Sequence, residues 1–207
     1  MSTPSLKVVV AITSPIAFHA LKNQSILETC LDAARAFTSQ YGSSAHLAVA
    51  GTAELLQRLD LDWEKIQCDP NSAQEFARSL SKAQPCELVM IHDSQRPLTK
   101  PAQFDRVFQA LAPTIDAVRP VSAFTETLKT ISADRCVEGT IDRNSMKRIS
   151  TPELIRYNAI DFDGSTSTWF VPLKADAMIA TVEADPESTR INSEKEIQLM
   201  KHLLEWN

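Results

Sequence analysis

Glycine is scarce in this sequence: it occurs four times in 207 residues and never before Gly42. Neither the G-x-G-x-x-G motif of dinucleotide-binding folds nor the G-x-S-x-G motif of serine hydrolases occurs. Glycine is also the residue that allows close backbone approach and positive φ without steric cost, as phosphate-binding loops require. The sequence therefore disfavours a dehydrogenase and a serine hydrolase.

Cysteine is sparse too, and its positions form no metal or redox motif. The four residues Cys30, Cys68, Cys86 and Cys136 show no C-x-x-C spacing and no nearby histidine pair. Zinc sites and dithiol redox sites both depend on such spacing. We therefore expect neither, and we interpret these side chains as reduced, mostly buried, small apolar groups.

Excess positive charge and long apolar runs are also absent. Lysine and arginine number 21 against 26 acidic residues, the net charge is -5, and the longest basic cluster is Lys147-Arg148. Nucleic-acid-binding domains gather basic residues on one face, so we expect no nucleic-acid partner. No apolar run reaches membrane-spanning length and residues 1–7 lack signal-peptide features, which predicts a cytoplasmic protein without membrane contact.

The sequence does contain a regular alternation of strand patterns and helix patterns. Its 207 residues, 43% of them hydrophobic, fit one domain over residues 1–207. Capping boxes at Ser25-x-x-Glu28 and Ser193-x-x-Glu196 open the first and last helices. The alternation predicts an α/β fold with a mostly parallel, twisted sheet and helices on both faces. The expected strands cover residues 7–12, 45–50, 65–68, 87–91, 117–121 and 177–182, and the other expected helices cover 52–59, 72–83 and 101–112.

Residues 125–143 break this alternation. A strand-like run over residues 126–131 is followed by a polar turn near Ala133-Asp134 and a second strand-like run over 137–141. Because two strands joined by a short polar turn pair antiparallel, this segment predicts a β-hairpin arm that projects from the domain.

The segment His92-Asp93-Ser94-Gln95-Arg96-Pro97 directly follows an expected buried strand. Open α/β sheets place ligands at the carboxyl ends of strands, where a carboxylate can hold a divalent cation against a substrate phosphate. Asp93 is therefore a candidate metal ligand. The alternative is a structural role, in which Asp93 and Arg96 form an ion pair in a loop that leads to a helix near Pro101.

Several blocks, taken in order, resemble the 2-C-methyl-D-erythritol 4-phosphate cytidylyltransferase family. The resemblance runs from about Lys22 to Leu203, and the order of the blocks argues against coincidence. The blocks are residues 22–28, like the opening of the family's first long helix; 92–97, like its H-D-A-A-R-P signature; 126–129, like its D-T-x-K element; and 139–144 with 150–153, like its T-V-D-R and Q-T-P-Q elements.

This resemblance implies a GT-A-like, nucleotide-diphospho-sugar-transferase-like fold and a homodimer with interlocked β-arms. It also implies transfer of a cytidylyl group from CTP to the polyol phosphate 2-C-methyl-D-erythritol 4-phosphate, with Mg2+ as cofactor and release of pyrophosphate. In such a reaction the acceptor phosphate attacks the α-phosphate in line, and the protein supplies position and positive charge.

The resemblance assigns roles to residues that match the family's motifs. Asp93 is the implied metal ligand and a catalytic residue. The other implied roles are cofactor binding by Arg96, contact with the substrate phosphate by Thr127 and Thr151, contact with the substrate across the dimer by Arg143, and substrate binding by Arg190, which stands where the family has a lysine.

The chain departs from the family pattern between Ile12 and Lys22. The family has there a glycine-rich loop with an arginine and a lysine, whose N–H groups and cations cradle the triphosphate. This chain has a shorter loop without glycine, in which Lys22 and His19 are the nearest replacement cations. Lys22 is therefore the second catalytic candidate, although a solvent-exposed loop position is the commoner explanation for lone charged side chains such as these two.

Two further segments depart from the family. Residues 71–75 replace a glycine-rich turn, and Ser72 with Glu75 predicts a capping box that turns the carboxylate toward the backbone. Residues 165–170 replace a T-D-x-A-S element, for which Thr166 or Thr168 is the candidate substitute.

Three functions fit these features. The first is an active cytidylyltransferase with an altered nucleotide loop. The second is a degenerate, non-catalytic homologue that serves as a dimeric binding or regulatory module. The third is a transferase of similar fold that acts on another phosphorylated polyol or sugar. Sequence alone leaves the first two closely matched, because acceptor-side residues are present whereas the cationic loop is not.

Overall fold

The structure is a computed structural model that describes residues 4–165 and 170–205. Strands and helices alternate along the first half of the chain, as the sequence predicts. The strands are β1 Leu6–Ala11, β2 Ala45–Gly51, β3 Glu64–Gln67, β4 Leu88–Asp93, β5 Ala117–Ala123, β6 Leu128–Ile131, β7 Val137–Ile141, β8 Lys147–Ile149, β9 Glu153–Arg156 and β10 Ile179–Glu183. The α-helices are α1 Ile26–Thr38, α2 Ala53–Leu56, α3 Ala73–Leu80, α4 Pro101–Gln109 and α5 Glu194–Glu205.

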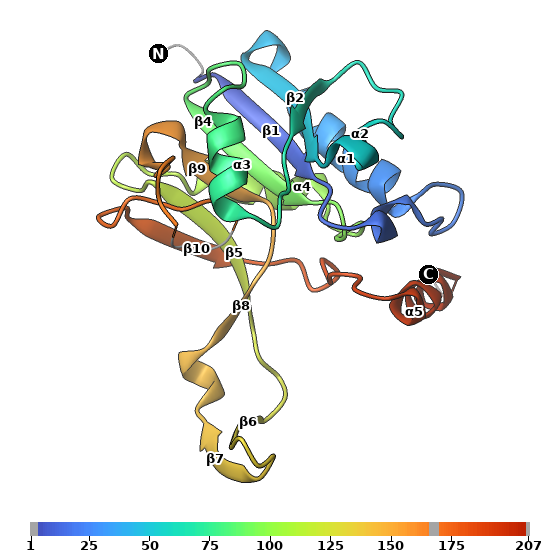
Figure 1. Cartoon of the computed structure of the whole chain (residues 1–207), viewed down its shortest axis with the longest axis vertical. Helices are drawn as coiled ribbons and strands as arrows, with labels where there is room; N and C mark the ends of the chain where they lie inside the picture. Colours follow the sequence, from blue (N-terminus) through green and yellow to red (C-terminus); the bar gives the residue numbers. More distant parts are fainter. Residues whose placement is uncertain (1–3, 166–169, 206–207) are drawn as a thin grey trace.

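One mixed sheet holds eight strands in the order β10-β5-β9-β4-β1-β2-β3, with β8 paired to β5 (Figure 1). The pairs β1 with β2, β1 with β4, β2 with β3 and β5 with β10 are parallel. Strand β9 runs antiparallel between β4 and β5, and β8 is antiparallel to β5. The mostly parallel sheet predicted from the sequence is therefore confirmed.

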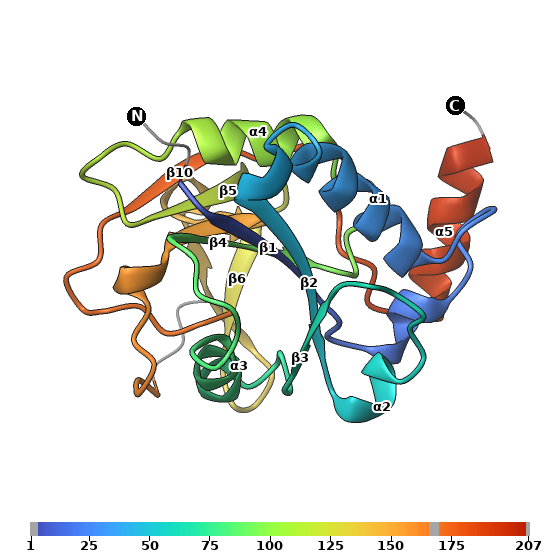
Figure 2. The same ribbon diagram turned by 90° about the horizontal axis from the view of Figure 1, so that it is seen from above.

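Both faces of the sheet are covered by helices. On β1, Val8 and Val10 point into a core cluster that includes residues of α1 and α4, whereas Val9 points into a second cluster with Phe76 of α3. Figure 2 shows α1 and α4 on one side of the sheet and α3 on the other. Because successive side chains of a strand point to opposite faces, a strand buried on both sides reads as a continuous apolar run, as β1 does.

The N-terminus of α1 carries the predicted capping box. The Ser25 hydroxyl accepts a hydrogen bond from the Glu28 N–H at 3.1 Å, and the Glu28 carboxylate accepts one from the Ser25 N–H at 2.6 Å. These two bonds satisfy donors that the first turn of a helix otherwise leaves unpaired. The helix that begins here packs its apolar face on β1 and β2.

Replacing Ser25 with alanine is expected to lower the free energy of unfolding by about 1 kcal/mol, because the Glu28 N–H loses its partner. Urea denaturation would measure the loss. A Ser43→Ala variant is the control, since Ser43 is exposed in the short 3-10 helix Gly42–Ser44, and its effect should stay within about 0.5 kcal/mol. Equal losses in the two variants would show that the cap contributes nothing particular.

Strands β6 and β7 form a separate two-stranded sheet that lies outside the main one. Figure 1 shows this arm extending away from the sheet beyond β5 and β8. It exposes apolar side chains, with Ile131 56% and Val137 63% accessible. None of the helices within the described residues is long and apolar enough to cross a membrane.

Candidate active site

The candidate site lies at the carboxyl edge of the sheet, where β4 ends. Ala11 on β1 pairs in register with Asp93 on β4, so Thr13 and the loop after Asp93 leave the sheet side by side. Residues beyond β10 return to the same edge, where the Ile191 N–H donates to the Gln95 carbonyl at 2.8 Å. Ligands of open α/β sheets bind at this edge.

Asp93 is the buried centre of the site, with 1% of its surface accessible. Its Oδ1 accepts hydrogen bonds from the Thr13 hydroxyl at 3.2 Å and from the Gln95 N–H at 3.0 Å. Its Oδ2 accepts one from Arg190 Nε at 2.6 Å, and Arg96 Nε lies 4.0 Å away. Both carboxylate oxygens are therefore surrounded by donors that belong to the protein.

All three nitrogens of the Arg190 guanidinium donate hydrogen bonds. Its Nη2 donates to the Thr13 hydroxyl at 3.1 Å and to Gln95 Oε1 at 2.5 Å, in addition to the bond from Nε to Asp93. Its Nη1 donates to Asn192 Oδ1. Because a guanidinium is planar and rigid, these contacts fix its position as well as its charge.

Arg96 is buried and uses its guanidinium mainly on uncharged oxygens. It donates to the Ser188 carbonyl at 2.6 Å, the Ser150 hydroxyl at 3.2 Å and the Ile149 carbonyl at 3.3 Å. Burial lowers the pKa of Arg96, and the nearby Asp93 opposes that shift. The ion pair between Asp93 and Arg96 that the sequence offered as an alternative is present at 4.0 Å. It is longer than the ion pair between Asp93 and Arg190, which is 2.6 Å.

His92 and Thr151 lie behind Asp93, and both are buried. The Thr151 hydroxyl accepts a hydrogen bond from the Asp93 N–H at 3.2 Å and lies 3.0 Å from His92 Nδ1. Burial lowers the pKa of His92 to about 4, so its ring is neutral at pH 7. Thr151 thus joins the end of β4 to the start of β9, and its hydroxyl is already paired within the protein.

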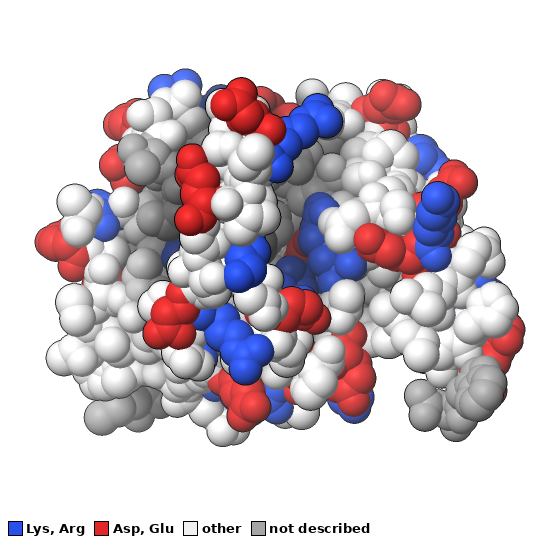
Figure 3. Space-filling model, turned by 90° about the horizontal axis from the view of Figure 1, so that it is seen from below, with Lys and Arg blue, Asp and Glu red and all other residues white. Residues whose placement is uncertain are grey.

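Two cavities meet at Arg190. The first, here called the basic cavity, has a volume of about 400 Å³ and includes Arg96, Arg148 and Arg190 in its wall. Two carboxylates also line it: Asp185 accepts a hydrogen bond from Arg106, and Glu196 accepts one from the Asn192 N–H. The second, here called the carboxylate cavity, has a volume of about 340 Å³ and is lined by Thr13, Pro70, Asn71, Asp93, Phe170 and Arg190. Arg190 lines both. Figure 3, viewed from the side of the arm, shows lysine and arginine side chains gathered in a hollow near the centre of the molecule.

Some of the predicted site residues lie away from Asp93. Lys22 Nζ donates to the Leu204 carbonyl near the end of α5. Thr127 and Arg143 are exposed on the arm, and Arg143 Nη1 donates to the Thr125 carbonyl at 2.5 Å. The structure therefore brings together Asp93, Arg96, Thr151 and Arg190, and it places Lys22, Thr127 and Arg143 outside this group.

The altered segment over residues 71–75 turns its carboxylate inward to the backbone, as predicted. The Ser72 hydroxyl accepts a hydrogen bond from the Glu75 N–H at 3.4 Å, and Glu75 Oε1 accepts one from the Asp69 N–H at 3.0 Å. The partner of the carboxylate is therefore Asp69, not the Ser72 N–H of a complete capping box. Asn71 donates its side-chain amide to the Thr13 carbonyl at 3.0 Å, which closes one wall of the carboxylate cavity. Thr166 and Thr168 lie outside the described residues.

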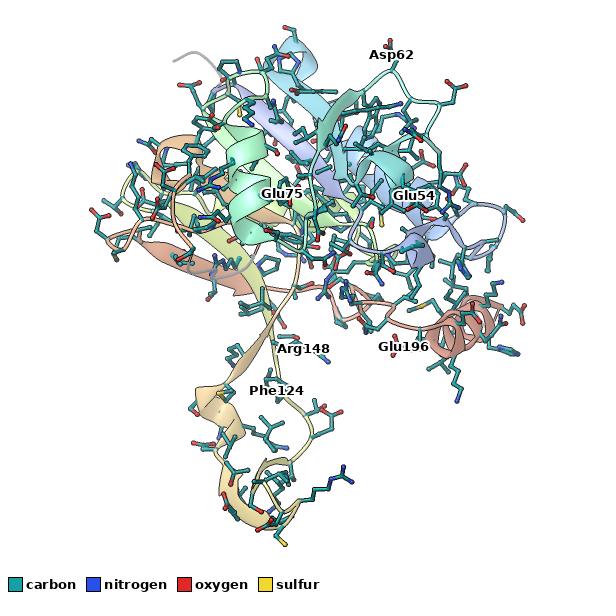
Figure 4. The ribbon with its side chains drawn as sticks, viewed as in Figure 1. Glu54, Asp62, Glu75, Phe124, Arg148 and Glu196 are labelled. Carbon is teal, nitrogen blue, oxygen red and sulfur yellow. The ribbon has the colours of Figure 1, made fainter. Side chains whose placement is uncertain are left out.

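Sequence reasoning missed Thr13, Gln95 and Arg148 as parts of the site. Gln95 carries a signal, because it stands where the H-D-A-A-R-P pattern has its second alanine. Arg148 belongs to the basic pair Lys147-Arg148, whose charge alone does not point to this site. Figure 4 shows Arg148 at the base of the arm, in the space between the arm and the chain that leads to α5.

A magnesium ion does not fit Asp93 as the site is folded. Mg2+ takes oxygen ligands in near-octahedral geometry, commonly one or two carboxylates together with substrate phosphates. Among the described residues Asp93 is the one carboxylate that lines the carboxylate cavity, and both of its oxygens are occupied by hydrogen-bond donors. Within residues 4–165 and 170–205, no group of three or more His, Cys, Asp or Glu side chains could hold a metal ion.

The structure is that of an α/β protein with a mostly parallel sheet, and Arg96 and Arg190 lie at the carboxyl edge of that sheet. Residues 10–162 match the family model for 2-C-methyl-D-erythritol 4-phosphate cytidylyltransferase. The chain belongs to this family, as its sequence motifs predicted.

Curated relatives and solved structures agree with that assignment. The 2-C-methyl-D-erythritol 4-phosphate cytidylyltransferase of Rhodococcus jostii (strain RHA1) is 29% identical over 133 residues, which cover 61% of this chain and 58% of that protein. The bifunctional enzyme IspD/IspF of Rhodospirillum rubrum is 37% identical over 120 residues, which cover 58% of this chain and 28% of that protein. The chain spans between 18% and 58% of the length of the curated relatives it matches.

The same fold occurs in solved structures of low sequence identity. The 2-C-methyl-D-erythritol 4-phosphate cytidylyltransferase of Thermus thermophilus matches with a TM-score of 0.75 at 20% identity, covering 95% of this chain and 98% of that one. The 4-diphosphocytidyl-2C-methyl-D-erythritol synthase of Anaerococcus prevotii matches with a TM-score of 0.74 at 16% identity, covering 97% and 99%. These likenesses support the fold.

Proposed function

We propose that the protein transfers a cytidylyl group from CTP to 2-C-methyl-D-erythritol 4-phosphate and releases pyrophosphate. Family membership supports this reaction. The structural observation that carries it is the position of Arg190, whose guanidinium lines both cavities at the carboxyl edge of the sheet. A fixed cation at the junction of two pockets suits a reaction in which two phosphate groups meet.

The proposed chemistry needs position and charge more than proton transfer. An oxygen of the acceptor phosphate attacks the α-phosphorus of CTP, and the bond from that phosphorus to the pyrophosphate oxygen breaks as the new one forms. We assign the nucleotide to the carboxylate cavity and the acceptor phosphate to the basic cavity, beside Arg96 and Arg148. Arg190 then stabilises the negative charge that develops between them.

We propose that the protein acts as a homodimer through its arm. Thr127 and Arg143 are exposed on this arm, away from Asp93, so they complete a site only if the arm reaches a second copy. Size-exclusion chromatography with light scattering would test this. A catalytic role for Lys22 requires its side chain to leave the Leu204 carbonyl. The cytoplasmic location and the dependence on magnesium stay predictions.

The test of the proposed function is pyrophosphate release by the purified full chain with CTP and 2-C-methyl-D-erythritol 4-phosphate, with the product identified by mass spectrometry. Turnover with this acceptor, and not with other phosphorylated polyols or sugars, would support it. Turnover with another acceptor alone would move the specificity to that compound. Failure to bind CTP at millimolar concentration in calorimetry would reject the enzyme and favour a non-catalytic dimeric binding module.

An Arg148→Gln substitution is expected to raise KM for the acceptor about tenfold while changing kcat little, because one charge-assisted hydrogen bond to phosphate is lost. Arg148 is anchored by a hydrogen bond from its Nε to the Ser122 hydroxyl at 3.2 Å, and it pairs with no carboxylate in the described part of the chain. Steady-state kinetics would measure both constants.

A Lys147→Gln variant is the matched control for this prediction. Lys147 is the neighbour of Arg148 on β8, is exposed, and does not line the basic cavity. The substitution removes the same charge from the same strand. If the two variants raised KM equally, the effect would be general electrostatic attraction, and the assignment of Arg148 to the acceptor phosphate would be wrong.

A further inference from the structure

We propose that Arg190 is the resident cation of this site and that Asp93 is its anchor, with Gln95 and Thr13 as positioning residues, so that Asp93 does not bind a divalent cation. The inference deepens the proposed function and rests on it for its catalytic meaning. The contacts that support the inference, and the binding experiment that tests it, do not depend on catalytic activity.

The first argument is competition for the Asp93 carboxylate. A divalent cation at Oδ2 would have to displace Arg190 Nε, which lies 2.6 Å from that oxygen. Displacement would also break the bonds from Arg190 to Thr13 and Gln95, because one rigid guanidinium makes all three. The other oxygen, Oδ1, accepts from a backbone N–H that cannot rotate away.

The second argument is the orientation of Gln95, which is buried with 1% of its surface accessible. The side-chain NH₂ of Gln95 donates to the Ile191 carbonyl. This bond orients the amide so that Gln95 Oε1 accepts a hydrogen bond from Arg190 Nη2. The Gln95 backbone N–H meanwhile donates to Asp93 Oδ1. One residue therefore fixes the carboxylate, the guanidinium and the chain next to Arg190. Alanine, which the family signature has at this position, could make none of the side-chain contacts.

The third argument is the charge itself. A guanidinium remains protonated at every physiological pH and pairs with phosphate through a planar fork of donors. Arg190 presents 31% of its side chain to solvent, whereas Asp93 presents 1%. Substrate phosphates entering either cavity would therefore meet the guanidinium, which is the more exposed group of this pair.

The decisive experiment is a titration of the full chain with Mn2+ alone, without nucleotide, followed by the EPR signal of free Mn2+. Wild-type protein is expected to show no saturable binding up to millimolar Mn2+. An Arg190→Gln variant should bind Mn2+ at least tenfold more tightly than wild type, because Asp93 Oδ2 becomes free, and the double variant with Asp93→Asn should lose this gain. Gln95→Ala should bind Mn2+ no better than wild type, because Arg190 Nε and the backbone N–H of residue 95 still occupy the two oxygens of Asp93.

The matched control is Arg148→Gln, which removes the same charge from the basic cavity and leaves Asp93 paired. It should behave like wild type. Saturable Mn2+ binding by wild-type protein that Asp93→Asn abolishes would overturn the inference, as would a natively folded Arg190→Gln variant that fails to gain a site. Exclusion of Mn2+ by a protein without cytidylyl transfer would reject the proposed function alone.

Discussion

Replacing Arg119 with methionine is expected to lower the free energy of unfolding by about 3–5 kcal/mol, because it strands a buried carboxylate. Arg119 on β5 donates through Nε to Glu153 Oε1 on β9, and their side chains are 7% and 0% accessible. The other Glu153 oxygen, Oε2, has no hydrogen-bond partner among the described residues. The remaining charge would therefore lose its counter-ion inside the sheet, which urea denaturation at pH 7 would measure.

The loss should shrink as pH falls, and the sign follows from the pKa. Burial raises the pKa of Glu153, and Arg119 opposes that rise. Without Arg119 the pKa of Glu153 in the folded protein rises further above its value in the unfolded chain, so the folded state binds the proton more readily. The variant is therefore most destabilised above the raised folded pKa and recovers stability as pH drops below it.

Two controls separate this pair from ordinary ion pairs. Arg35→Met removes an arginine paired with Asp32 whose side chains are 52% and 49% accessible, and exposed pairs contribute about 0–1 kcal/mol. The double variant Arg119→Met with Glu153→Met should recover most of the loss, since two apolar groups then replace the pair. Equal losses in Arg35→Met and Arg119→Met, or no recovery in the double variant, would contradict the prediction.

The elements that could be predicted from the sequence are those whose pattern is local. Strands β1 and β4 are continuous apolar runs, and α1 opens on a capping box that the structure contains. Strands β8 and β9 were not predicted. Strand β9 has the sequence Glu-Leu-Ile-Arg, and with a charged residue at each end this short segment shows no pattern typical of a strand. It becomes one because it fills the gap between β4 and β5, a non-local pairing that propensity does not encode.

For the candidate site, the sequence could predict several of the residues but not how they pair. Short motifs pointed to Asp93, Arg96, Thr151 and Arg190, and the structure brings these together. The pairing of Asp93 with Arg190 spans 97 residues, so its geometry could not be predicted from spacing. The sequence also left open whether Asp93 binds a metal or forms an ion pair with Arg96. In the structure Asp93 pairs with Arg190 at 2.6 Å, and Arg96 lies farther away at 4.0 Å.

The function of Arg190 leads to the largest expected kinetic effect. An Arg190→Gln variant is expected to lower kcat of cytidylyl transfer by about 10²–10³, as removal of one preorganised donor aimed at developing charge does elsewhere. The affinity for the acceptor should fall less, because Arg96 and Arg148 remain in the basic cavity. Rapid-quench measurement of a single turnover would isolate the chemical step from substrate binding and product release.

Arg190→Lys and Arg35→Gln complete this test. Lysine keeps the charge at a position where the family has lysine, so transfer should return to within about tenfold of wild type, with the residual loss reflecting the missing donor fork. Arg35→Gln removes an exposed arginine of α1 and should leave kcat unchanged. If Arg190→Gln raised KM while kcat stayed at the wild-type value, the guanidinium would bind ground state and transition state equally. Arg190 would then be a substrate-binding residue without a part in the chemical step.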